Sequence, residues 1–144
     1  MIRRALYAAA LLLALASPAW AGRTDDQGRQ DMIAWGTCAY ETGIFMETLK
    51  VEPGTVDDQD LARQALDSLT KVGSYYGKLG RTVNQADADE VHPLIVGPID
   101  ARVERYAGKP DMAAALRDEF RADLRACIAK ADALTTPAPA PSGT

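Results

Sequence analysis

The chain has 144 residues, with 20 acidic and 16 basic side chains and a formal net charge of −4 at pH 7. This length is enough for one domain with a hydrophobic core. An acidic balance without clustered basic residues excludes nucleic acid as a partner and makes an anionic membrane surface a poor one.

Residues 1–21 show the three parts of a secretory signal peptide in order. Arg3 and Arg4 form the positive end, an apolar run follows, and alanines at positions 19 and 21 favour cleavage after Ala21. A membrane-spanning helix needs about 20 apolar residues. Because the run is shorter than that, a retained membrane anchor is the less favoured interpretation.

Cleavage after Ala21 removes two arginines and no acid, which changes the net charge from −4 to −6. No later stretch of the sequence is apolar enough to span a membrane. We therefore expect the mature protein in the bacterial periplasm, or secreted, without stable membrane insertion.

Cys38 and Cys127 are the two cysteines of the chain, and both follow the expected cleavage site. In an oxidising compartment, two distant cysteines indicate a structural disulfide. Closing a loop of this length would stabilise the fold by about 4 kcal/mol in the chain-entropy model. Two free thiols or two metal ligands are the alternatives, although neither cysteine has a second cysteine or a histidine nearby in sequence.

The first predicted helix runs from about residue 24 to residue 50, where a Pro-Gly pair ends it. Thr24 and Gln27 have the spacing of a capping box. Gly36 and Gly43 lie on a side where another helix can approach closely. The apolar face consists of Trp35, Cys38, Thr42, Phe45 and Leu49, widened by Met32, Ala39 and Met46.

The second predicted helix runs from about residue 57 to residue 77 and begins with an acidic first turn. Thr55 or Asp57 caps its N-terminus. Gly73 and Gly77 are expected to let a neighbouring backbone come close before the helix stops.

The third segment is less regular. Asn84 caps its start, but Pro93 and Pro98 lack the backbone N–H that a continuous helix uses. We expect either a kinked helix or a short helix followed by a better one over about residues 98–107. The residues expected to face the core are Ile95, Ile99, Val103 and Tyr106.

The last predicted helix, about residues 110–134, has a single apolar stripe of Met112, Leu116, Phe120, Leu124, Cys127, Ile128, Ala131 and Leu134. The bridge would therefore join the first and last helices within the core. Residues 135–144 are rich in Pro and Ala and are expected to form a disordered tail. The predicted fold is an all-α bundle of four helices over residues 22–134, with the third helix broken by proline.

Tyr75, Tyr76 and Arg81 form the candidate surface for a ligand or a partner. The two tyrosines point to different sides of a helix, and at least one should leave its hydroxyl at the surface. Arg117, Arg121 and Arg125 repeat every four residues in the last helix. They would suit an anionic partner, but the acids between them favour a solvated face of mixed charge.

His92 is the only histidine, and no nucleophile with an orienting acid is recognisable around it. We therefore predict no catalytic residue, no metal and no cofactor. The favoured role of His92 is to cap the turn before a proline. A metal site with Asp89 and Glu90, or a haem site with Met32 or Met46, is an alternative.

Cys38, the segment from Tyr75 to Arg81 and Cys127 together resemble small exported helical proteins of alphaproteobacteria. These have one cysteine in the first helix, one in the last, and an aromatic-rich segment between. The resemblance implies the fold and the compartment and no activity. A weaker likeness, in the residues from Cys38 to Gly43, is to periplasmic immunity proteins of the Rap1a/Tai type, which neutralise type VI secretion amidases.

From these features we expect an exported, non-enzymatic helical protein that binds a partner protein or a small ligand. One alternative is an immunity-type inhibitor of a secreted toxin. The other is a carrier of a metal or of haem.

Overall fold

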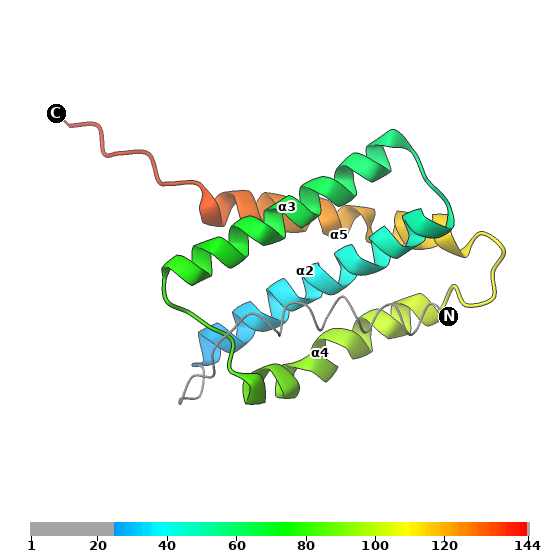
Figure 1. Ribbon diagram of the computed structural model, residues 1–144, viewed down its shortest axis with the longest axis horizontal. Helices are drawn as coiled ribbons and strands as arrows, with labels where there is room; N and C mark the ends of the chain where they lie inside the picture. The colour runs from blue at the N-terminus through cyan, green and yellow to red at the C-terminus, as the bar shows by residue number, and fades with distance from the viewer. Residues whose placement is uncertain (1–24, 144) are drawn as a thin grey trace.

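The computed structural model describes residues 25–143, so the expected signal peptide and its cleavage site lie outside the described residues. The described part is all-α, as predicted, and contains no strand. Its four helices follow one another in the order α2 (Asp26–Val51), α3 (Val56–Lys78), α4 (Gln85–Glu104) and α5 (Met112–Thr135) (Figure 1).

Side chains before three of the helices accept hydrogen bonds from free backbone N–H groups, as N-caps do. Thr55 and Asp58 form a reciprocal capping box at the start of α3, with both bonds 3.1 Å long. The Asn84 side chain accepts from the backbone of Ala86 at the start of α4. The cap of α2 is Asp25, one residue later than expected, and its carboxylate accepts from Gly28 N at 2.7 Å.

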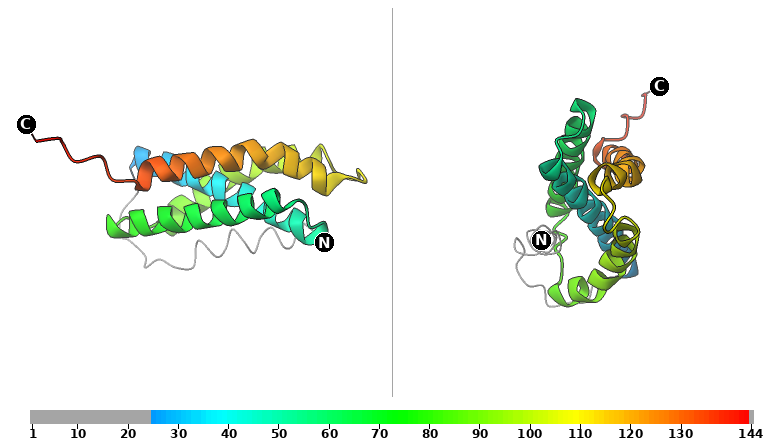
Figure 2. Two further views of the ribbon diagram at one scale, coloured as in Figure 1. Left: turned by 90° about the horizontal axis from the view of Figure 1, so that it is seen from above. Right: turned by 90° about the vertical axis from the view of Figure 1, so that its right-hand side faces the viewer.

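The centre of the bundle is α2, which packs against all three other helices, whereas α4 packs chiefly against α2 (Figure 2). The predicted face of α2 is buried at Cys38, Thr42 and Phe45. Tyr40 and Ile44 are buried as well, one turn apart, and the Tyr40 hydroxyl donates to Asp100 of α4 at 2.9 Å. Because neighbours cover α2 on several sides, a prediction from one apolar stripe misses these two residues.

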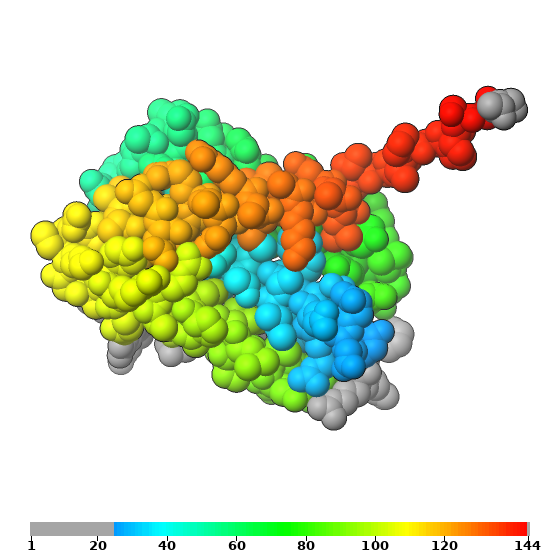
Figure 3. Space-filling model, turned by 180° about the vertical axis from the view of Figure 1, so that it is seen from behind, coloured from blue at the N-terminus to red at the C-terminus, as the bar shows by residue number. Residues whose placement is uncertain are grey.

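The hydrophobic core lies where α2, α3 and α5 meet, and α4 adds Ile99 to it. The predicted stripe of α5 supplies three of its members. From behind, α5 crosses the molecule with α3 on one side and α4 on the other (Figure 3). The core consists of Tyr40, Ile44, Phe45, Leu61, Ala62, Ala65, Ile99, Leu116, Phe120 and Leu124.

The proline break expected in the third segment is absent, because α4 is one helix that contains both Pro93 and Pro98. Both prolines are exposed, so the carbonyl groups that lose a helical partner face water. The opposite face buries Val91 and Ile99. At Gly36 of α2, an added Cβ would collide with the Ile95 side chain, so the expected close approach to Gly36 is made by α4.

The predicted disulfide is present and joins α2 to α5. The Cα atoms of Cys38 and Cys127 are 5.9 Å apart, and 89 positions separate the two residues in sequence. Cys38 is 5 % exposed, which places the bridge inside the bundle.

Residues 136–143 carry no helix or strand and are exposed. A disordered tail remains a prediction, as do the limits of the mature domain. Among the described residues, no helix is both long enough and apolar enough to cross a membrane.

Replacing Cys38 and Cys127 together with alanine should lower the free energy of unfolding by about 4 kcal/mol, because the unfolded chain gains the freedom of the opened loop. Urea unfolding followed by circular dichroism measures the change. The wild-type protein should lose about as much stability in a reductant, and the variant should lose nothing further. Equal stability of the oxidised wild type and the variant would contradict a stabilising bridge.

Candidate functional site

Tyr76 and Arg81 of the predicted surface lie together at the end of the bundle where α2 begins and α3 ends. The Trp35 indole N–H donates to the Tyr76 hydroxyl at 3.3 Å, and Lys130 of α5 lies 5.1 Å from the centre of the Trp35 ring. The Arg81 guanidinium is 3.8 Å from the Asp31 carboxylate. We call this cluster the aromatic pole; its members are Asp31, Trp35, Tyr75, Tyr76, Leu79, Arg81, Val83 and Lys130.

The two tyrosines of the aromatic pole are half-buried and stand edge to face, with ring centres 5.4 Å apart. Burial raises the pKa of the Tyr76 hydroxyl, and the Asp31 carboxylate beside it raises that pKa further. The Tyr76 hydroxyl therefore stays protonated and can donate a hydrogen bond.

The loop after α3 has a defined backbone because it closes the helix with a Schellman motif. Gly80, at φ +66°, donates to the Gly77 carbonyl, and Arg81 donates to the Tyr76 carbonyl, both at 3.0 Å. This turn holds Arg81 against Tyr76. At Gly73 and Gly77 an added Cβ would meet nothing within 4 Å, so the expected close backbone contact there is wrong.

The same loop presents apolar side chains to solvent, with Leu79 55 % exposed and Val83 39 % exposed. Between them, the Thr82 hydroxyl oxygen is buried and has no hydrogen-bond partner within residues 25–143. A buried hydroxyl without a partner costs free energy. The aromatic pole thus combines exposed apolar groups, half-buried aromatic rings and an unsatisfied polar atom.

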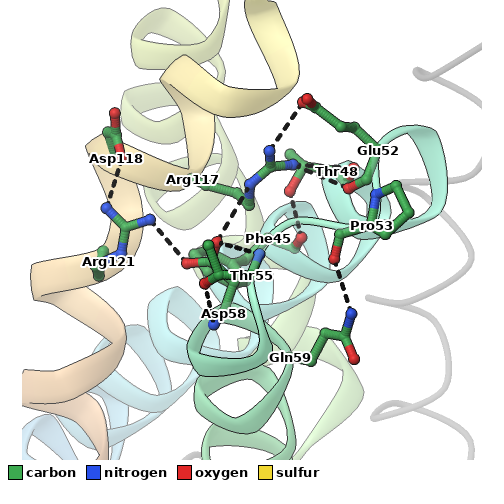
Figure 4. Close-up of polar contacts among 10 residues, drawn as sticks. All are labelled: Phe45, Thr48, Glu52, Pro53, Thr55, Asp58, Gln59, Arg117, Asp118 and Arg121. Carbon is green, nitrogen blue, oxygen red and sulfur yellow. Dashed lines mark hydrogen bonds and ion pairs between the residues drawn. The ribbon is translucent and has the colours of Figure 1, made fainter.

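A second polar cluster lies at the opposite end of the bundle and ties α5 to the junction of α2 and α3 (Figure 4). Arg117 is 5 % exposed, contacts Asp58 at 3.8 Å and Glu52 at 2.9 Å, and donates to the carbonyl groups of Thr48 and Glu52. Arg121 reaches the other oxygen of Asp58 at 2.7 Å. We call Asp58, Arg117 and Arg121 the arginine clamp.

Burial alone would raise the pKa of Asp58, but hydrogen bonds from Arg121 and Thr55 outweigh burial and hold the pKa below its ordinary value. The solvated face expected for the repeated arginines is therefore wrong for Arg117, which is buried and unavailable to an anionic partner. Arg121 is partly exposed and also pairs with the exposed Asp118 of its own helix. Both side chains point at carbonyl and carboxylate groups of neighbouring helices, which a helical repeat cannot reveal.

Arg125, the third arginine of the repeat, is exposed and has no ion-pair partner among residues 25–143. It borders an open depression of about 300 Å³ between α3 and α5, where charges of both signs surround two apolar side chains. The lining residues are Asp57, Asp60, Leu61, Gln64, Arg125 and Ile128.

A third polar cluster joins α4 to α2 and α5. Arg102 lies 2.9 Å from Glu41, 2.9 Å from Glu119 and 2.6 Å from Asp123, and its guanidinium stacks over the Phe120 ring. Hydrogen bonds from Tyr106 and Arg102 lower the pKa of Glu119. We call Glu41, Arg102, Glu119 and Asp123 the Arg102 network.

Glu41 differs from the other acids of the Arg102 network because it is only 4 % exposed. Burial and the nearby Asp123 raise its pKa from 4.5 to about 7, against the opposing effect of Arg102. An acid with this pKa suits proton transfer, but a side chain so deeply buried presents no oxygen to a substrate.

His92 is exposed inside α4, where no turn precedes Pro93, so the expected role of His92 in capping such a turn is wrong. Within residues 25–143, no group of three His, Cys, Asp or Glu side chains is placed to hold a metal ion.

The chain matches no protein-family model, no curated protein and no solved structure. The resemblances to exported alphaproteobacterial proteins and to immunity proteins therefore stay predictions.

The sequence pattern did not identify several members of these clusters as functional residues. For two of them, the positions of the bonded cysteines carry the missing information. Trp35 lies three residues before Cys38, and Lys130 lies three residues after Cys127. Because helices joined by the bridge run antiparallel, these two side chains must lie near each other. No comparable signal pointed to Arg102, whose partners come from two other helices, α2 and α5.

Replacing Asp58 with asparagine should lower the free energy of unfolding by about 3 kcal/mol, since it removes the buried carboxylate shared by Arg117 and Arg121 and leaves the buried Arg117 with only the exposed Glu52 as a counter-charge. The matched control is Asp60→Asn in the same helix, which should cost less than about 0.5 kcal/mol because its ion pair with Arg63 is exposed. Urea unfolding of both variants tests the arginine clamp. Equal losses for the two variants would show that the clamp does not stabilise the fold.

Proposed function

We propose that this chain is an exported, periplasmic protein without catalytic activity, and that it binds a partner protein through the aromatic pole. The observation that carries the proposal is the exposure of Leu79 and Val83 beside half-buried aromatic rings and Arg81. Exposed apolar side chains that are rimmed by polar groups are typical of a protein–protein interaction site.

Export is supported by the signal-peptide pattern of residues 1–21 and by the bonded cysteines. The Arg3-Arg4 pair, the apolar run and the alanines before position 22 match a cleavable leader. A disulfide between distant helices forms and persists in an oxidising compartment. Both features favour the periplasm over the cytoplasm.

Binding at the aromatic pole is supported by the composition and the rigidity of its surface. Tyr, Trp and Arg are the residues that contribute most to binding energy at protein interfaces. The Schellman motif at Gly80 and the contacts of Trp35 with Tyr76 and Lys130 hold the site in place before binding. A preorganised surface loses less conformational entropy when a partner docks.

The absence of catalysis is supported by the placement of the reactive groups. His92 stands exposed on α4, away from any nucleophile that the sequence singles out. Glu41, whose pKa of about 7 suits acid–base chemistry, is enclosed by Arg102 and the helices around it. A protein of this kind acts by contact.

The double variant Leu79→Ser, Val83→Ser should retain a periplasmic partner at least about tenfold less well than the wild type, because it removes the exposed apolar contacts. The matched control is Val51→Ser, Val56→Ser at the other end of the bundle, where the valines are 68 % and 72 % exposed. Quantitative capture from periplasmic extract with the three proteins as baits makes the comparison.

A protein captured equally by the wild type and the control, and lost by the Leu79→Ser, Val83→Ser variant, is the expected result. Equal capture by all three baits would place the binding site elsewhere. Hydrolysis of a cell-wall or ester substrate by the purified protein would contradict the absence of catalysis.

A further inference from the structure

The Arg102 network places three carboxylates around one guanidinium. Glu41, Glu119 and Asp123 each contact Arg102 within 2.9 Å. Arg105 adds a second positive charge, but it reaches only Glu119 and is 61 % exposed. Negative charge therefore exceeds positive charge at the point where α2, α4 and α5 meet.

Charged groups of α4 and α5 set this balance around Glu41, and no hydrogen bond or ion pair joins Glu41 to a described residue of α3. On α4, Arg102 contacts Glu41 directly, while Arg105 and Tyr106 act on Glu119. On α5, Asp123 repels the Glu41 carboxylate. Of the three acids, Glu41 is the most buried, so water compensates its charge least.

The Arg102 network is also the polar attachment of α4 to the rest of the bundle. Arg102 and Tyr106 bind the acids of α5, and Arg102 binds Glu41 of α2. On the apolar side, α4 buries Val91 and Ile99, and Ile95, Val96, Val103 and Tyr106 pack partly buried against the core. Two prolines inside α4 also remove backbone hydrogen bonds. The charge state of the network thus acts on the helix that packs chiefly against a single neighbour, α2.

We propose that Glu41 is a proton-binding site whose occupancy controls how tightly α4 is held against α2 and α5. Protonation strengthens the attachment and ionisation weakens it. The protein thereby senses the pH of its surroundings through one buried carboxyl group.

The direction follows from the linkage between proton binding and opening. In the closed form, burial and Asp123 raise the pKa of Glu41 to about 7. When α4 separates from α2, Arg102 leaves and Asp123 stays, and both effects oppose a lower pKa. Water nevertheless reaches the carboxylate and removes the burial that is the largest cause of the raised pKa, so the pKa falls toward the ordinary 4.5. The closed form binds the proton more tightly, so the added stability is complete below about pH 4.5 and is lost as the pH rises through about 7.

Hydrogen exchange of the folded protein, measured at pH 6 and pH 8 and corrected for the intrinsic rates, tests the proposal. The protection of slow α4 amides should be about tenfold higher at pH 6 than at pH 8, because opening releases the proton. The amides of α3 serve as the internal control. They should change little, because α3 packs against α2 and α5.

Two variants separate a proton switch from a general effect of pH. Glu41→Gln keeps the size of the side chain and cannot ionise, so its α4 protection should be the same at both pH values. Asp123→Asn removes the like charge beside Glu41 and so lowers its pKa. The pH at which the protection of the α4 amides falls should therefore be lower in this variant than in the wild type. Each variant is first compared with the wild type by circular dichroism at pH 6.

Two results would overturn the proposal. The first is an undiminished pH effect on α4 in Glu41→Gln, which would assign the effect to another group. The second is an equal change in the protection of α3 and α4, which would show that pH acts on the whole fold. Because exchange requires no partner, neither result bears on binding at the aromatic pole.

Discussion

The bridge between Cys38 and Cys127 sets the register on which the other contacts of the bundle depend. It joins α2 to α5 with the two helices antiparallel, so residues at equal distances from the two cysteines face each other. Three residues to one side, Trp35 meets Lys130. Ten residues to the other side, the Thr48 carbonyl accepts from Arg117. A shift of α5 by one turn would separate both pairs at once.

Between those two points, the same register brings Glu41 of α2 close to Asp123 of α5. Two acids placed next to each other in a covered site raise the free energy of the charged form. The positive charge of Arg102 on α4 offsets the two negative charges. Protonation of Glu41 is therefore expected to change how tightly α4 is held. The bundle therefore has an end held by the buried ion pairs of the arginine clamp, a titratable middle, and an end at the aromatic pole where exposed apolar side chains lie beside half-buried aromatic rings.

Much of this fold is predictable from local pattern. Apolar spacing and capping residues gave four helices with ends close to those observed, and the stripes of the first and last helices each contained one cysteine. Tyr76 and Arg81 lie together because a Gly-closed helix end is itself a local motif. These features depend on residues that are a few positions apart. In a helix or a turn, such residues are also neighbours in space, so their spacing in the sequence predicts their contacts.

The rest depends on contacts between distant segments. Arg117 and Arg125 each follow a leucine of the core stripe, yet one is buried and the other exposed, because only the former faces the carbonyl groups that end α2. Pro93 and Pro98 predict a break, but packing of Val91 and Ile99 on the opposite face holds the helix together. In the sequence, Glu41 looks like an ordinary surface acid. Only the packing of α4 and α5 against α2 buries it.

The mass of the intact protein recovered from the periplasmic fraction, measured without reductant, tests the central claim most directly. A single species beginning at Gly22 and lighter by two hydrogens than its reduced form would show cleavage, export and the Cys38–Cys127 bridge together. A full-length chain in the cytoplasm, with two thiols that react after unfolding, would contradict export and the register that the bridge sets.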